Sequence, residues 1–251
     1  MVGYACPARS LVDLIPSLPL SFAPRTQRPT FSLSLPLFSS GGCNASIRFE
    51  YDEPYNTGLN QAFAFVWSGK HLLDLKWPGL FSTADCIAIA AACSVAANKG
   101  PLVNVGYGRV DTDTPDVTLG IGTHGDVGKD LGIEGLLADW SAFGFTPHQL
   151  CILSGAHTVG IGAQVTPQSR LGDSNFNNGY YRDVLAGRGF FASDKALADS
   201  PLTLPCVQAA AQSQDWFFQE WKREFFEMTW WGTAEQGLER KGLEGREWFK
   251  G

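Results

Sequence analysis

The histidine at position 157 has neighbours that suit a metal-bound imidazole. Ser154, Gly155 and Ala156 precede it within segment 153–160, and such small residues let a flat macrocycle come close to the backbone. Haem iron is commonly held by one proximal histidine. A lone histidine on a helix is, however, more often a hydrogen-bonded core residue than a ligand. Position 157 alone therefore leaves both interpretations open.

A carboxylate further along the chain could support this histidine. A ligating imidazole usually donates its far N–H to a carboxylate or carbonyl, which fixes its tautomer. Asp194 opens an expected helix after a turn bounded by Gly187 and Gly189. The alternative is an acid at a helix start, stabilised by the helix dipole. The other histidines of the chain are His71, His124 and His148.

The elements that must position these side chains are predicted to be helices. The sequence shows few strand-like runs and no alternation of strand and helix patterns, so the predicted fold class is mainly α. Residues 105–133 and 160–175 are expected to be irregular, and 77–79 to form a turn. The predicted helices cover 58–67, 82–97, 133–143, 146–157, 178–185, 205–211 and 214–228, with a short one opened by Asp194.

The predicted helix 82–97 carries both a start and a stop signal. Ser82 and Asp85 form a capping box, while Lys99, Gly100 and Pro101 supply a basic end, a C-cap and a stop. Small residues occupy nearly every face of this helix, which predicts that it is packed deep in the interior.

The helix that leads to His157 also has a strong start. Thr146 is the expected cap, with Pro147 at the first helical position and Gln149 closing the capping box. The last predicted helix carries an aromatic stripe at three- and four-residue intervals, which we interpret as core packing. Its members are Phe217, Trp221, Phe225 and Met228.

Composition and cysteine spacing exclude several classes of protein. The formal net charge of -6 argues against a nucleic-acid partner, because general nucleic-acid binding needs a basic face. The absence of an uninterrupted apolar run of about 18 residues predicts no membrane span. No CxxC pair occurs, so a zinc ribbon is not indicated. Cys86, Cys93 and Cys151 lie in apolar helical stretches and are interpreted as buried free thiols.

Six segments in the same order resemble the plant, fungal and bacterial haem peroxidase superfamily. They are GGCNASIRFEYDEPYNTGL at 41–59, STADCIAIAAACSV at 82–95, GYGRVDT at 106–112, LSGAHTVG at 153–160, NFNNGYYRDVLAGRGFFASDKAL at 175–197 and QDWFFQEW at 214–221. The likeness spans roughly residues 41–232 and looks closest to ascorbate-peroxidase-like members, with secreted-plant-peroxidase features in the later half. It implies a multi-helical haem peroxidase-like fold whose N-terminal distal helix is missing or replaced.

The resemblance implies a role for each matching residue. His157 would be the axial ligand of a haem b iron, and Asp194 would be its proximal carboxylate partner. Asn56 would orient a distal histidine, and Thr158 would help to bind a calcium or potassium ion. The residues expected to contact the cofactor on this side are Ser154, Gly155, Ala156, Thr158 and Phe176.

The chain departs from the family on the distal side. Members carry an arginine and, four positions on, a histidine shortly before the Gly-Gly pair; the histidine shuttles a proton and the arginine stabilises charge. Here residues 30–40 contain neither, and no histidine precedes His71. Arg25 and Arg28 have no histidine at the proper spacing. Thr83 stands where secreted members have a cysteine, so their disulfide set is not reproduced.

These observations divide the chain and leave two functions open. Residues 1–40 are expected to be an irregular leader, 41–234 a peroxidase-like domain and 235–251 a charged tail. The first function is a haem-dependent peroxidase that reduces hydrogen peroxide with a small organic electron donor. The alternative is a non-catalytic peroxidase-fold protein that binds haem or serves as a scaffold. The acid-poor leader favours a plastid or another organelle, and the mixed resemblance leaves secretion open.

Overall fold

The computed structural model describes residues 44–49, 59–115, 132–142, 144–159 and 175–230, and the regular secondary structure of these residues is helical, with no strand among them. The mainly α prediction is therefore confirmed. The elements in chain order are η2 (Ser46–Phe49), α1 (Leu59–Lys76), α2 (Thr83–Ala97), α4 (Ile133–Ala142), α5 (Pro147–Ser154), η4 (Gly155–Thr158), α6 (Gly179–Leu185), α7 (Ala192–Ala196), α8 (Leu204–Gln212) and α9 (Gln214–Trp230). Within these residues no helix has the length and apolar character needed to cross a bilayer.

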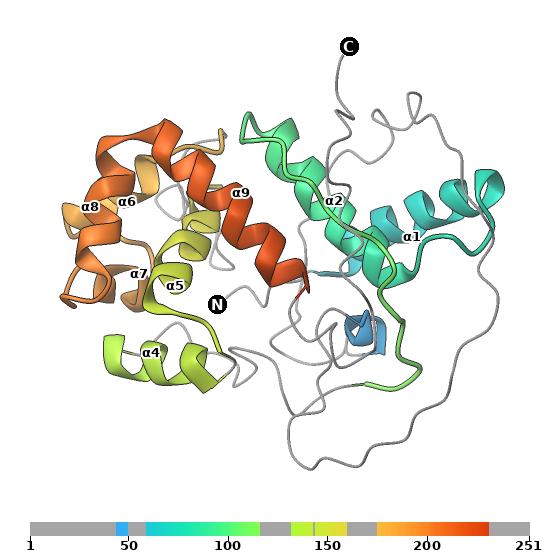
Figure 1. Cartoon of the computed structure of the whole chain (residues 1–251), viewed down its shortest axis with the longest axis horizontal. Helices are drawn as coiled ribbons and strands as arrows, with labels where there is room; N and C mark the ends of the chain where they lie inside the picture. The colour runs from blue at the N-terminus through green and yellow to red at the C-terminus, as the bar shows by residue number, and fades with distance from the viewer. Residues whose placement is uncertain (1–43, 50–58, 116–131, 143, 160–174, 231–251) are drawn as a thin grey trace.

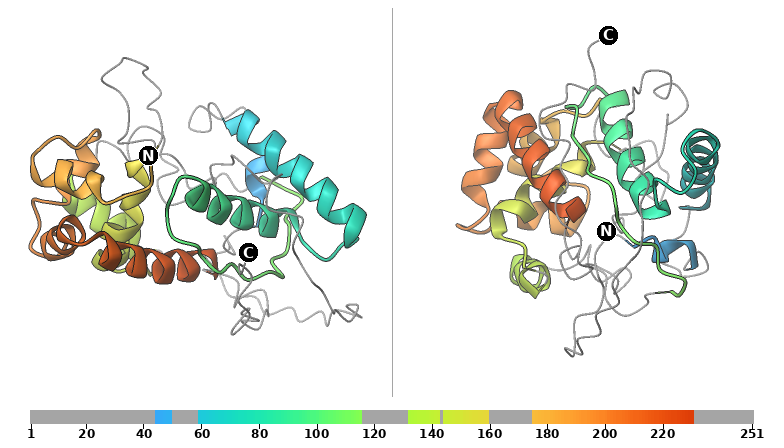
Figure 2. Two further views of the ribbon diagram at one scale, coloured as in Figure 1. Left: turned by 90° about the horizontal axis from the view of Figure 1, so that it is seen from above. Right: turned by 45° about the vertical axis from the view of Figure 1, so that its right-hand side comes forward.

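The helices form two groups that are bridged by α9. Helices α4 to α8 gather on one side and α1 with α2 on the other, while α9 runs from the first group toward α2 (Figures 1 and 2). The larger core lies among α4 to α9 and also takes in Ala88, Ala91 and Val95 of α2. A smaller core, which contains Val66 and Cys86, joins α1 to α2. Helix α2 therefore contributes to both cores.

Helix α2 confirms the predicted capping box and the predicted burial. The Ser82 side chain accepts from the Asp85 N–H, and the Asp85 carboxylate accepts from the Ser82 N–H. The end of the helix differs from the prediction: Asn98 is the C-cap, and Lys99, not Gly100, has a positive φ of 64°. Gly100 is required for another reason, because an added Cβ would lie 2.8 Å from the Phe176 ring.

Helix α1 is longer than predicted. It continues through Ser68 and Gly69 to Lys76, because the buried positions Val66, Gly69 and Leu73 extend one face at helical spacing. The stripe on α9 is confirmed as core packing, since Phe217, Trp221 and Phe225 are buried and Met228 packs against them. The predicted loop at 160–175 lies largely outside the described residues.

A disulfide joins α5 to α8, and it corrects the interpretation of Cys151 as a free thiol. Cys151 bonds to Cys206, 55 residues away, with 6.4 Å between their Cα atoms. Both cysteines are buried, so an apolar environment did not distinguish a bonded cysteine from a free one. Cys86 is a buried free thiol, as predicted, whereas Cys93 is free but only partly buried.

Candidate active site

His157 lies just after the C-terminal end of α5, a helix that is packed in the core. Thr146 caps this helix with Pro147 at its start, and the capping box with Gln149 is complete, as predicted. Residues 150–153 are all buried, so the helix is fixed in the core. The Ser154 hydroxyl donates to the Leu150 carbonyl at 2.8 Å, and the backbone tightens into η4, which carries His157.

Asp194 meets His157 from the first turn of α7. The distance between His157 Nδ1 and Asp194 Oδ1 is 2.7 Å. The other carboxylate oxygen accepts the N–H of Phe191, the N-cap of α7, at 2.8 Å. Asp194 is therefore both an acid at a helix start and the partner of the histidine.

The environment of Asp194 keeps its carboxylate ionised. Burial acts to raise the pKa of Asp194, but the hydrogen bond and charge interaction with His157, helped by the Phe191 N–H and the Tyr180 hydroxyl, leave this pKa below its usual value. An ionised carboxylate can only accept, so Nδ1 of His157 carries the proton. In the neutral form of the ring, Nε2 presents a lone pair, and the described residues supply no hydrogen-bond partner for it.

The described surroundings fit the proximal side of a haem site. The ring of Phe191 packs edge-on against the His157 ring at 5.4 Å between centroids, and that of Tyr180 at 6.0 Å. The His157 side chain remains 12% exposed, and a buttressed imidazole with a free Nε2 is the donor that haem iron uses. The hollow that His157 lines has a volume of only about 10 Å³, so the described residues do not by themselves enclose a porphyrin.

The predicted cofactor-contacting residues are not all gathered at this hollow. Ser154 lines it together with His157 and Asp194. Thr158 is fully buried and donates its hydroxyl toward Asn177 at 3.4 Å. The ring of Phe176 lies elsewhere in an aromatic cluster: its centroid is 5.5 Å from that of Phe217 and 4.8 Å from that of Trp221.

Gly155 and Ala156 belong to the packing between the site and the core. A Cβ on Gly155 would lie 2.4 Å from the Tyr181 hydroxyl and 2.8 Å from the Phe217 ring. The small size of Gly155 is therefore required by the core, whether or not a macrocycle lies nearby. Ala156 is partly buried against the same core. Asn56, expected to orient a distal histidine, lies outside the described residues.

Sequence reasoning missed several neighbours of the histidine–aspartate pair. The hydroxyl of Tyr180 donates to Asp194 Oδ1 at 2.9 Å, and Trp140 of α4 lines the hollow. No spacing rule connects these positions with His157, because they come from different helices. The hydrogen bond from the Phe191 N–H to Asp194 could be predicted, since an acidic residue three positions after the N-cap usually accepts from the N-cap N–H.

Comparison with known proteins shows the family of this chain. The peroxidase family profile matches residues 20–213, which is well over half of the sequence, and the chain belongs to this family. Its relatives include Peroxidase 18 of Arabidopsis thaliana, 27% identical over 80% of this chain and 75% of that protein. Putative L-ascorbate peroxidase 6 of the same plant is 30% identical over 75% of this chain, which spans 56% of that relative. Peroxidase 66, also from Arabidopsis thaliana, is 27% identical over 79% of this chain and 76% of its own length.

Proposed function

We propose that this protein binds haem b through Nε2 of His157 and uses it in peroxidase-type chemistry. The observation that carries the proposal is the 2.7 Å hydrogen bond from His157 Nδ1 to the buried carboxylate of Asp194. Family membership supports the choice of haem over another metal group. When bound, haem would supply the redox-active iron that reacts with hydrogen peroxide and accepts electrons from a small organic donor.

The protein residues would orient the ligand and tune its basicity. The Asp194 carboxylate accepts the hydrogen bond from Nδ1–H, which fixes the ring orientation and makes Nε2 a stronger electron-pair donor to a metal. Tyr180 donates to the same carboxylate oxygen as His157, and so draws off part of the negative charge. The strength of the iron–histidine bond would therefore depend on both partners of Asp194.

The cation predicted near Thr158 remains part of the proposal. The hydroxyl of the buried Thr158 and the side-chain oxygen of the partly buried Asn177 lie 3.4 Å apart. Hydroxyl and amide oxygens are ligands for hard cations, and the resemblance assigns this place to calcium or potassium. We assign the peroxidase-like domain to residues 41–234, with the predicted leader and tail on either side.

A second candidate is a haem-binding protein with little peroxidase turnover. It is favoured by the sequence before position 71, which contains no histidine. His71 itself is exposed on α1. Loss of a positioned acid–base group typically costs a factor of about 10² to 10⁴ in rate, so such a chain would bind haem and react slowly with peroxide.

Reconstitution with haem tests the ligand assignment. We expect the wild-type chain to give the Soret spectrum of a histidine-ligated haem, and we expect His157→Ala to lose it. His71→Ala is the matched control, because it removes an exposed imidazole from α1 and should leave the spectrum unchanged. An identical spectrum in wild type and His157→Ala would refute ligation by His157.

Turnover then separates the two candidate functions. Hydrogen peroxide and an electron donor such as ascorbate or guaiacol are added to the reconstituted wild-type chain. Rapid oxidation of the donor, lost in His157→Ala, would support the peroxidase. A histidine-ligated spectrum without donor oxidation would support the slow haem-binding protein.

A further inference from the structure

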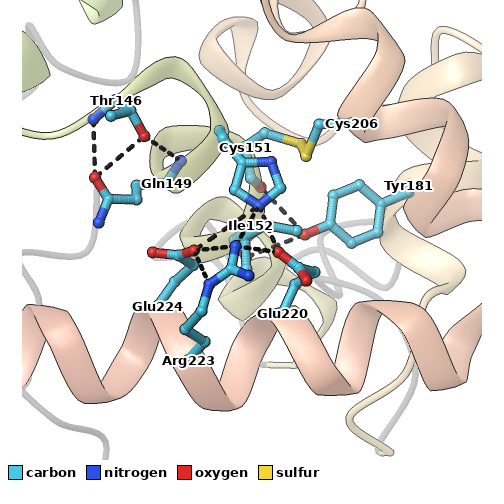
Figure 3. Close-up of polar contacts among 10 residues, drawn as sticks. Thr146, Gln149, Cys151, Ile152, Tyr181, Cys206, Glu220, Arg223 and Glu224 are labelled. Atoms are coloured by element: carbon cyan, nitrogen blue, oxygen red, sulfur yellow. Dashed lines mark hydrogen bonds and ion pairs between the residues drawn. A yellow bond between two sulfur atoms is a disulfide. The ribbon is translucent and has the colours of Figure 1, made fainter.

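A second cluster of metal-ligating side chains lies between α5 and α9. His148 is the second residue of α5, and its Nε2 lies 2.7 Å from an oxygen of Glu220 and 3.9 Å from an oxygen of Glu224. The two glutamates stand four residues apart, so they point from the same face of α9 (Figure 3). One ligand atom from each of the three residues fits within a 4.8 Å span.

The three ligands are held by their surroundings. The side chain of Glu224 is 6% exposed and that of Glu220 is 15% exposed, while His148 is 36% exposed and faces solvent on one side. The ring of Trp216 packs edge-on against the His148 ring, with 6.0 Å between centroids. The two carboxylates of the cluster are therefore largely buried, while the His148 side is open to solvent and would let an ion enter.

Arg223 now pairs with both of these carboxylates. Its guanidinium lies 2.5 Å from Glu220 and 2.7 Å from Glu224, and Figure 3 shows it between them. The guanidinium of Arg223 always carries its charge. The side chain is 59% exposed, however, and its hydrogen-bond partners among the described residues are all members of the cluster. It can therefore turn out to solvent without breaking a contact to the core.

We propose that His148, Glu220 and Glu224 form a binding site for a divalent transition-metal ion such as Zn²⁺, which exchanges with the guanidinium of Arg223. One imidazole and two carboxylates match the nitrogen and oxygen ligands that Zn²⁺ accepts, and a water would complete the tetrahedron. Zinc–ligand bonds of about 2.0–2.2 Å place ligand atoms within roughly 4.4 Å of one another, so small rotamer changes suffice. An imidazole favours Zn²⁺, Ni²⁺ or Cu²⁺ over Mg²⁺ or Ca²⁺.

The exchange is balanced in charge and would strengthen one contact between helices. Two carboxylates carry a charge of -2, which is half compensated by Arg223 and would be fully compensated by a divalent ion. The ion would link the start of α5 to the middle of α9, while the disulfide at Cys151, three residues after His148, links α5 to α8.

Zinc titration of the full chain tests the site. The accessible thiols are first alkylated, metal is removed with a chelator, and Zn²⁺ binding is measured by isothermal titration calorimetry. We expect a site whose affinity falls at least tenfold in His148→Ala and in Glu220→Gln. Arg223→Gln should bind Zn²⁺ several-fold more tightly, because the competing cation has been removed. His71→Ala should bind like the wild type, since His71 lies on α1.

Two results would overturn the proposal. One is an unchanged zinc affinity in His148→Ala; the other is unchanged or weaker binding by an Arg223→Gln variant whose circular dichroism shows a native fold. If Arg223→Gln does not fold, Co²⁺ in the wild-type chain decides. Visible d–d absorption that Zn²⁺ displaces, and that His148→Ala lacks, supports the site, and its presence in both chains refutes it.

Discussion

Three hydrogen bonds converge on the carboxylate of Asp194, and they define the chemistry available to His157. One oxygen accepts from His157 Nδ1 and from the Tyr180 hydroxyl, and the other accepts from the Phe191 N–H. A buried carboxylate with three donors is held in one position and one charge state. The imidazole is therefore oriented before any ligand binds, which is what a proximal ligand requires.

Replacing Asp194 by asparagine should destabilise the folded chain in a pH-dependent way. The folded pKa of Asp194 lies below its usual value, and the unfolded value is about 3.9. The ionised carboxylate therefore contributes stability above pH 4, and this contribution is lost as the pH falls through the lower, folded pKa. Urea unfolding of the haem-free chain should show Asp194→Asn less stable by about 1.5–3 kcal/mol at pH 7. The gap should shrink at pH 3; an equal gap at both values would contradict this account.

Gly155 should not tolerate even one added methyl group. The Cβ of Gly155→Ala would lie 2.4 Å from the Tyr181 hydroxyl and 2.8 Å from the Phe217 ring, and both groups are fixed in the core. Overpacking of this kind costs about 1–3 kcal/mol, which thermal unfolding can measure. Gly132→Ala is the control, because a Cβ there meets nothing within 4 Å. Equal melting temperatures for the two variants would show that the core yields at Gly155.

At the scale of elements, α5 is the part that positions the site. Its first turn is capped by Thr146, and its middle is bonded to α8 through Cys151 and Cys206. Its exposed start contacts α9 through His148 and Glu220. Because the helix is held at three places along its length, His157 at its end has a fixed position relative to α7.

Removing the disulfide should weaken this arrangement substantially. Closing a loop of 55 residues removes conformational entropy from the unfolded chain, and the loss of such a crosslink costs about 2–4 kcal/mol. We expect the Cys151→Ala/Cys206→Ala double variant to unfold at a lower urea concentration than the oxidised wild type. Treating the wild type with dithiothreitol should bring it to the same midpoint. A midpoint insensitive to both changes would argue against a bonded pair.

The sequence predicts the local features of the helices well, and it does not predict the contacts between separate helices. The starts of α2 and α5 were predicted to the residue, because capping depends on neighbours three positions apart. The His157–Asp194 pairing came from the family resemblance, since neither residue alone favoured it. The Cys151–Cys206 bond and the Tyr180 contact were missed, because each depends on how separate helices pack. Helix α1 was predicted too short, because a Ser-Gly pair resembles a helix end when its burial is unknown.

At the scale of the whole molecule, one buried ion pair connects the two groups of helices. Asp85, in the first turn of α2, pairs with Arg109 at 2.9 Å, and both side chains are fully buried. The same guanidinium donates to the carbonyls of Gly106 and of Thr229, near the end of α9, and lies 5.1 Å from the ring of Trp230. Asp85 also accepts the backbone N–H groups of Gly108 and Arg109. This charged network therefore joins α2 to α9 in addition to the apolar core to which both helices contribute.

Breaking either half of this network should be among the most damaging single changes in the chain. Arg109→Met leaves Asp85 buried without its counter-ion, and Asp85→Asn leaves Arg109 in the same condition; such losses cost about 3–5 kcal/mol. The double variant should cost less than the sum of the single variants, because it leaves no unpaired buried charge. Urea unfolding of all four chains gives this coupling energy directly. Arg188→Ala serves as the control, since it removes an exposed ion pair with Asp183 and should change stability by no more than about 1 kcal/mol. Two results would mean that hydrophobic packing alone holds α2 and α9 together. One is a loss of unfolding free energy in the double variant equal to the sum of the losses in the Asp85 and Arg109 single variants. The other is a loss in each single variant similar to that of Arg188→Ala.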